Sequence, residues 1–178
     1  AIEPGGTYRA RVRMQDADGH WSHWSAPLEF TAGANAAVPT LVISELHYNP
    51  AAHPAVVDAQ DLEFIEVLNT GGQPVDLAGV ELATFATTPY TFGAGLILQP
   101  GQRIVVPKNP TAFAAVYGTS VLVAPGGYGD SNLSNGGETI TLVAAGGAVI
   151  QTIAYDDEGG WATDADGNGS SLEIINPA

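Results

Sequence analysis

LVISELHYNP, residues 41–50, and EFIEVLNTGGQPVDLAG, residues 63–79, are the two stretches that decide the fold of this chain. The first predicts a strand over residues 40–46, followed by a proline-containing loop. The second continues a strand expected over residues 61–69, which a Gly-Gly pair then ends in a turn. Short apolar runs separated by glycine and proline are typical of an all-β domain.

The rest of the chain repeats this pattern of short strands and turns. Its 22 glycines and 12 prolines fit many strands joined by tight connections. The glycine-rich segment 126–137 is interpreted as a flexible loop. The Gly-Gly turn leads into residues 74–84, and residues 97–107 are expected to contain a Pro-Gly turn followed by a strand. Strands are also expected over residues 120–124, 138–155 (a hairpin around Gly146 and Gly147) and 170–175.

One helix is expected, over residues 109–118. Asn109 is a good N-cap, Pro110 fits the first helical turn and Gly118 stops the helix. The predicted fold class is therefore all-β, a β-sandwich with one short helix.

Residues 7–14 form a separate pattern near the start of the chain. Tyr8, Ala10, Val12 and Met14 alternate with Arg9, Arg11 and Arg13, which is the period of a half-buried strand. A turn is expected at residues 16–19 and a second strand over 26–32, so the segment predicts a β-hairpin. We expect Trp21 and Trp24, in the stretch WSHWS, to stack on the three arginines.

Charge and composition exclude several function classes. A net charge of −14, from 19 acidic and 5 basic residues, opposes a phosphate backbone, so no nucleic-acid partner is expected. The lack of cysteine excludes disulfides, thiol catalysis and cysteine-based metal sites. No apolar run of 18 residues is present, so no membrane insertion is expected. No signal-peptide pattern opens the chain, and we expect it to be a piece of a longer, exported precursor.

Residues 41–176 resemble the lamin-tail domain of the type found in exported bacterial proteins. The stretches that carry the resemblance are the two quoted above, followed by LQPGQRIVV, FAAVYG, SNGGETITLV and WATDADGNGSSLE. The resemblance implies an immunoglobulin-like β-sandwich with a modular, non-catalytic role, at the bacterial cell surface or outside the cell. The nuclear role of lamins is not carried over, because the charge is wrong for a DNA partner.

The N-terminal segment is similar to the last two strands of a fibronectin type III domain, on the stretch TYRARVR. Its repeated Trp-Ser also resembles the WSxWS box of cytokine-receptor domains. A whole sandwich of this type needs about seven strands, so about five are missing. The expected organisation is a partial fibronectin type III-like segment over 1–32, a linker over 33–39 and a lamin-tail domain over 40–178.

A calcium loop is the best candidate for a metal site. Asp164, Asp166, Asn168 and Gly169 match positions 1, 3, 5 and 6 of such a loop, whereas position 12 is Ile175 instead of glutamate. The alternative is a tight turn, since Asp-Gly and Asn-Gly supply positive φ angles. Calcium is the one cofactor under consideration.

Three glutamates, Glu45, Glu63 and Glu66, have the residue type of a glycosidase carboxylate pair. We interpret them as surface charges or loop anchors, because Glu63 and Glu66 point to opposite faces of a strand. His47 and His53 are placed in a proline-rich loop. Five tyrosines offer a sugar platform, although core packing is the favoured interpretation: Tyr48, Tyr90, Tyr117, Tyr128 and Tyr155.

Two hypotheses for function follow. The favoured one is a non-enzymatic structural or adhesive module that associates with other proteins or with itself by strand complementation through residues 7–32, and builds extracellular fibres. The alternative is a calcium- or carbohydrate-binding accessory domain of an exported hydrolase, with a glycan as ligand. Arg9, Arg11, Arg13, Trp21 and Trp24 are the expected interaction residues.

Overall fold

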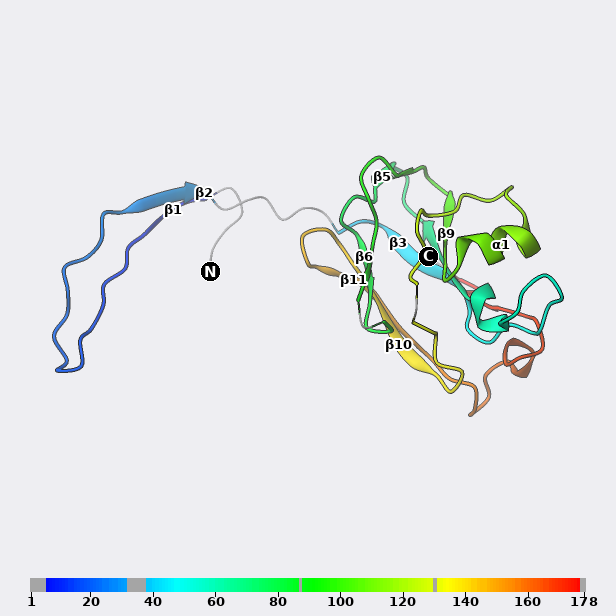
Figure 1. Cartoon of the computed structure of the whole chain (residues 1–178). Coiled ribbons are helices and arrows are strands. Elements are labelled where there is room, and N and C mark those ends of the chain that lie inside the picture. The colour runs from blue at the N-terminus through cyan, green and yellow to red at the C-terminus, as the bar shows by residue number, and fades with distance from the viewer. Residues whose placement is uncertain (1–5, 32–37, 87, 130, 177–178) are drawn as a thin grey trace. The chain divides into compact units, whose positions relative to one another are not determined.

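The computed structural model describes residues 6–31, 38–86, 88–129 and 131–176. The chain divides into two compact units, Ala1–Ala37 and Val38–Ala178, each described by itself (Figure 1). Most of the linker expected over residues 33–39 lies outside the described residues. No helix in the described part of the chain is long and apolar enough to cross a membrane.

The first unit contains a two-stranded antiparallel hairpin, β1 (Thr7–Ala10) and β2 (Leu28–Thr31). Both strands are shorter than the expected 7–14 and 26–32. The reason lies in two serines farther along the hairpin. Ser25 N–H donates to the Val12 carbonyl, but Val12 N–H donates to the Ser25 hydroxyl at 3.1 Å instead of to its carbonyl. Ser22 does the same with Met14, so side chains interrupt the backbone ladder.

One sheet of the second unit has the strand order β12-β3-β4-β9, and its strand pairs are antiparallel. Its strands are β3 (Leu41–His47), β4 (Phe64–Asn69), β9 (Arg103–Pro107) and β12 (Leu172–Glu173). The strand expected over 61–69 begins late, because Ala59–Leu62 form the 3-10 turn η1, whose cap Asp58 accepts from Gln60 N–H. The final strand expected over 170–175 is reduced to β12.

The other sheet has the order β11-β10-β6-β7. Its strands are β6 (Glu81–Ala83), β7 (Tyr90–Thr91), β10 (Glu138–Val143) and β11 (Val149–Tyr155). The hairpin expected over 138–155 is confirmed; Gly147 has φ 83° in its turn and donates to the Ala144 carbonyl. A small pair, β5 (Val75–Asp76) and β8 (Ile97–Leu98), adds a further two-stranded sheet.

The core lies between the two larger sheets and confirms the immunoglobulin-like sandwich. Period two puts the apolar side chains of each strand on the inner face, and in β3 a register shift between Ile43 and Glu45 brings Leu46 to the same face as Ile43. From β3 and β4 these are Ile43, Leu46, Ile65 and Val67, and from β10 they are Ile140 and Leu142, all buried.

The expected helix is confirmed as α1 (Pro110–Tyr117). The Asn109 side chain accepts from the N–H groups of Thr111 and Ala112 at 3.1 and 3.2 Å, and Gly118, with φ 81°, ends the helix. Phe113 of this helix packs on Phe64 and Val105, on the face of the sheet that points away from the main core.

The prediction of a strand over residues 120–124 is wrong, because these residues form only one isolated bridge. Val105 N–H donates to the Leu122 carbonyl, and Ala124 N–H donates to the Val105 carbonyl. These two bonds make one isolated parallel bridge between Val123 and Val105, which is too short to form a ladder.

Asn69, at the end of β4, is fully buried and holds the turn that follows it. Its amide donates to the Gln73 and Leu98 carbonyls at 2.8 and 2.9 Å, and its Oδ1 accepts from Gly71 N–H at 2.9 Å. One side chain thus forms hydrogen bonds with three backbone groups in and around this turn.

Substitution Asn69→Ala is expected to destabilise the protein by about 2–4 kcal/mol, because the buried Leu98 carbonyl and two part-buried bonds, to Gln73 and Gly71, lose their partner. The exposed Asn132, changed to Ala, has no such role and serves as the control. Urea unfolding followed by circular dichroism measures both. A loss below about 1 kcal/mol for Asn69→Ala would show that the turn holds without it.

Candidate functional site

Two tryptophan side chains of the hairpin contact the same arginine, Arg13. The guanidinium of Arg13 lies 4.2 Å from the Trp21 ring centroid and 4.7 Å from that of Trp24. The expected stacking is therefore found for Arg13. Two cation–π contacts at an exposed site contribute roughly 0.5–1 kcal/mol each, which helps to keep both indoles on the same side of the hairpin.

The other two arginines have different surroundings. Arg9 lies opposite Glu29 in the β1–β2 register, and the two form an ion pair. Arg11 is exposed and lines a shallow hollow with Arg9 and Trp24. Arg11 is therefore the arginine best placed for a contact with another molecule.

The tip of the hairpin brings three ionisable groups within 4.8 Å of one another, Asp16, Asp18 and His20. The Asp16 carboxylate already accepts from the N–H groups of Asp18 and His20. These bonds close the turn that the sequence predicted, and the exposed cluster is explained by that role.

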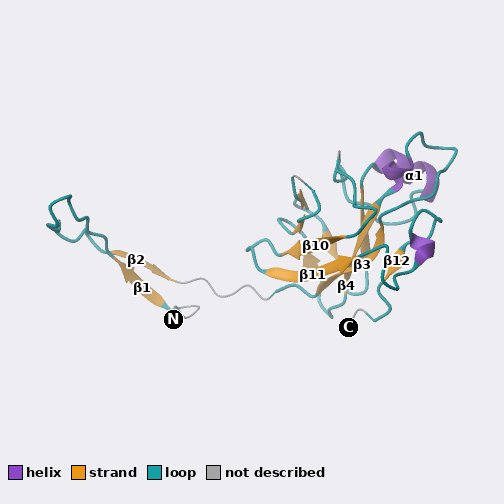
Figure 2. Cartoon of the chain, turned by 90° about the horizontal axis from the view of Figure 1, so that it is seen from below, coloured by secondary structure: helices purple, strands orange, loops and turns teal. Residues whose placement is uncertain are grey.

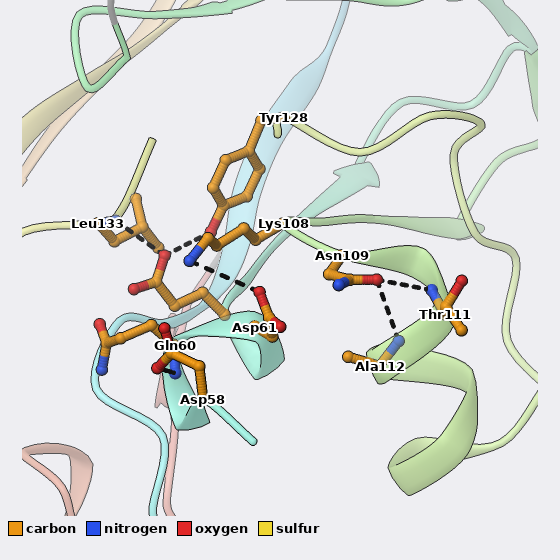
Figure 3. A network of polar contacts seen from close by, with 10 residues as sticks. Asp58, Gln60, Asp61, Lys108, Asn109, Thr111, Ala112, Tyr128 and Leu133 are labelled. Carbon is orange, nitrogen blue, oxygen red and sulfur yellow. Dashed lines mark hydrogen bonds and ion pairs between the residues drawn. The ribbon is translucent and has the colours of Figure 1, made fainter. Parts of the chain in front are cut away.

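Glu63 is the most unusual carboxyl group of the second unit, because it is fully buried. Its Oε2 accepts from the Tyr128 hydroxyl at 3.0 Å and from Leu133 N–H at 2.8 Å (Figure 3). Oε1 has no partner in the described structure. Burial raises the pKa of Glu63 to about 7, although both hydrogen bonds oppose the rise. The expectation of a loop anchor is correct for this residue, and that of a surface charge is wrong.

The residues that Glu63 holds belong to the glycine-rich segment 126–137. Tyr128 and Gly129 also donate their N–H groups to the carbonyls of Pro107 and Lys108. The described part of this segment is thus attached to the sheet at several points, which differs from the flexible loop that its composition suggests. Sequence alone gave no signal for this, because Glu63 and Tyr128 are far apart in the chain.

Lys108 is the basic residue nearest to this network. Its Nζ lies 3.7 Å from Asp61 Oδ1, and its backbone N–H donates to the Glu63 carbonyl (Figure 3). The arrangement ties η1, β9 and the start of α1 together. The Lys108 side chain is largely buried and the Asp61 side chain is partly exposed, whereas the buried Glu63 carboxyl is turned toward Tyr128 and Leu133.

A row of three glutamates crosses the outer face of the β12-β3-β4 sheet. Glu173 lies opposite Glu45, and Glu45 lies opposite Glu66 in the strand register. Burial raises the pKa of Glu45; the Ser171 hydrogen bond opposes this rise, and the charges of Glu66 and Glu173 add to it. Arg103 Nε lies 3.0 Å from Glu66 and compensates one end of the row. Like charges on neighbouring strands are unfavourable.

Comparison with known families matches residues 34–157 to the model described as Lamin Tail Domain. The chain belongs to the lamin tail domain family. A search of curated proteins finds no match to it. The lamin tail domain is an immunoglobulin-like, non-catalytic family and is often structural. The sheet strand β12 and the loop 163–170 lie beyond the matched range but belong to the same compact unit.

The glutamates of this lamin tail domain do not form the pair that glycoside chemistry needs. Glu63 bonds Tyr128 and Leu133, whereas Glu66 accepts from the Ser44 hydroxyl at 2.6 Å and pairs with Arg103. Each carboxyl is therefore occupied by contacts that hold the fold.

The candidate calcium residues lie around the 3-10 turn η2 (Thr163–Ala165). Asp166 accepts from the Asn49 amide at 2.7 Å, and the Asn168 amide donates to the carbonyls of Thr163 and Asp166. Asp164 uses its backbone carbonyl to accept from Ser170 N–H. These bonds are those of a closed turn that fastens the segment to Asn49; a calcium role for the three residues stays a prediction.

Core packing is the correct interpretation for four of the five tyrosines, since Tyr48, Tyr90, Tyr128 and Tyr155 are buried. Tyr117 is partly exposed, and its hydroxyl lies 3.1 Å from His47 Nδ1. His47 belongs to β3 and is buried, so its placement in a proline-rich loop is wrong. Burial lowers the pKa of His47 to about 4.

Glu63 and His47 impose opposite pH dependences on stability. Between pH 4.5 and about 7 the folded chain keeps the Glu63 proton that the unfolded chain releases, so this carboxyl stabilises the fold as pH falls. Between pH 6.5 and about 4 the unfolded chain protonates His47 and the folded chain does not, so this ring destabilises the fold as pH falls.

Substitution Glu63→Gln is therefore expected to expose the effect of His47. Below pH 6.5 the variant should lose stability with a slope approaching about 1.4 kcal/mol per pH unit, whereas the parent changes little down to pH 4.5. In His47→Phe the free energy of unfolding should instead rise as the pH falls from about 7 to 4.5, because only the effect of Glu63 remains. Urea unfolding at five pH values tests both. Parallel profiles for the parent and Glu63→Gln would contradict the burial argument.

Proposed function

We propose that this chain is a non-catalytic structural or adhesive module of an exported or cell-surface protein. In this proposal it associates with further copies of itself through the hairpin of residues 7–31, and repeated contacts build extracellular fibres. Membership of an often structural immunoglobulin-like family supports the first part. The likeness of the hairpin to a fibronectin type III segment, which stays a prediction, favours a cell-surface location.

The distribution of arginines along the chain carries the self-association proposal. Residues 7–31 hold Arg9, Arg11 and Arg13, three of the five basic residues, and the three acids Asp16, Asp18 and Glu29, so this segment has no net charge. Residues 38–178 hold 15 of the 19 acidic residues and only Arg103 and Lys108 as bases, which gives a net charge of −13. A neutral segment is repelled less by the acidic domain of another copy than a second acidic domain would be, and its exposed Arg11 supplies a positive charge for acidic side chains there.

The apolar side of the hairpin supports the same proposal. Val12, Met14 and Leu28 are 69, 76 and 67% exposed. Residues 6–31 form two strands and no second layer, and such a hairpin is marginal in water by itself. Among the described residues β1 and β2 pair only with each other, so each strand has an outer edge, and such edges are templates for strand addition. Head-to-tail addition that does not close into a ring gives filaments.

Light scattering over a range of concentrations is the test of this proposal. The chain 1–178 is expected to increase in mass with concentration, whereas residues 38–178, which have their own core, should stay monomeric. High salt should weaken the association, because it screens the charge attraction. Equal monomeric masses for both chains at every concentration would exclude self-association through the hairpin.

A calcium- or carbohydrate-binding accessory domain of an exported hydrolase is the second candidate function. The spacing of Asp164, Asp166 and Asn168 favours it. The hydrogen bonds of Asp166 and Asn168 weigh against it, since they give both side chains a structural role in the turn that needs no calcium. We therefore expect no saturable calcium binding below about 1 mM, the weak end for extracellular sites.

Isothermal titration calorimetry with calcium measures the affinity directly, and Asp164→Asn is the matched variant. Saturable binding below about 1 mM in the parent, lost in Asp164→Asn, would overturn the expectation and favour the second candidate.

A further inference from the structure

One side of the sandwich has two open sheet edges. The seven-residue strand β11 pairs with β10 alone, and β12, the edge of the other sheet, is only two residues long. Because β12 lies opposite Glu45 and Leu46, the first half of β3 extends past it (Figure 2). An edge strand of this kind presents backbone groups that another strand can pair with.

A side chain fills part of the place that a strand would take. Ile43 N–H, in the uncovered half of β3, donates to Gln151 Oε1 of β11 at 2.7 Å. The next bond along β3 is made by the chain after β12, where Ile174 N–H donates to the Ser44 carbonyl. The edge of β3 is therefore satisfied at this point by one amide side chain rather than by a full backbone ladder.

Between β11 and β12 lies an apolar groove of about 390 Å³. Its lining includes the apolar side chains of Ile43, Ile153, Trp161 and Leu172, together with Glu45 and Glu173. Trp161 is 41% exposed and Ile175, at its end, fully exposed. An open apolar groove beside a short edge strand is the setting in which added strands bind: backbone bonds give affinity, and alternate side chains fill the groove.

The row Glu173, Glu45 and Glu66 begins at the same edge. Leu172 of β12 packs against the core, and Glu173 lies on the opposite face of the same strand; both residues line the groove, as Glu45 does. A strand added outside β12 would thus place one set of alternate side chains in the groove and the other set beside Glu173. A strand that fits this site has apolar side chains on the face toward the groove and positively charged side chains on the face toward Glu173.

We propose that the groove and the β12 edge receive residues 8–14 of a second copy of this chain. The apolar face of Tyr8, Val12 and Met14 enters the groove, and Arg11 lies beside Glu173. This inference rests on the proposed self-association and names its acceptor surface. The contact relieves the repulsion along the glutamate row, and it covers the apolar faces of both partners.

Charge reversal at each side of the contact is the test. Full-length Arg11→Glu and Glu173→Arg are each expected to weaken self-association at least tenfold in sedimentation velocity. An equimolar mixture should recover it, since Arg11 of one variant meets Glu173 of the other. Glu81→Arg makes the same charge change on the other sheet and should associate like the parent. Thermal unfolding confirms that each variant is folded.

The outcomes separate the two proposals. If Arg11→Glu weakens association and Glu173→Arg does not, the hairpin mediates association but the groove is not its acceptor. Loss in both variants without recovery in the mixture also overturns the paired contact. If the parent is monomeric throughout, self-association itself fails and the acceptor proposal with it.

Discussion

A β-sheet must have its apolar face covered, and this constraint organises both units of the chain. In residues 38–178 the two sheets cover each other, and their alternate side chains form one core. In the hairpin, residues 6–31 supply two strands with an apolar face and no second layer. The same period-two pattern therefore gives two sheets that cover each other in one unit and an exposed apolar face on the described strands of the other.

Buried polar groups hold the connections around that core. Asn69 fixes the turn after β4, and Glu63 fastens the segment that contains Tyr128 and Leu133. Both lie at the ends of β4, the strand between β3 and β9. The central strand thus carries an anchor at each end, and these hydrogen bonds act together with the apolar packing of Tyr128 and Leu133 in the core.

The sequence was sufficient for features that local chemistry determines. Asn109, Pro110 and Gly118 mark α1, and the glycine turn marks the β10–β11 hairpin. It was insufficient where distant residues meet. A strand pattern with acids at Glu63 and Glu66 does not show that one carboxyl is buried under Tyr128 while the other meets Arg103. The position of His47 in β3 and the single bridge between Val123 and Val105 also depend on contacts between distant residues, so the sequence did not predict them.

Arg13 and Glu173 illustrate the same limit at the candidate site. The spacing of arginines and tryptophans predicted stacking, and Arg13 shows it. The alignment of Glu173 with Glu45 and Glu66 required the strand register, because these residues come from three separate segments. The acceptor edge could therefore be found only from the fold.

Hydrogen exchange of the full chain at low and high concentration tests the central claim most directly. Strand addition between copies predicts that amides of residues 8–14 and of 172–175 become protected together as concentration rises, while those of β10 do not change. Exchange that is independent of concentration in both segments would contradict the account.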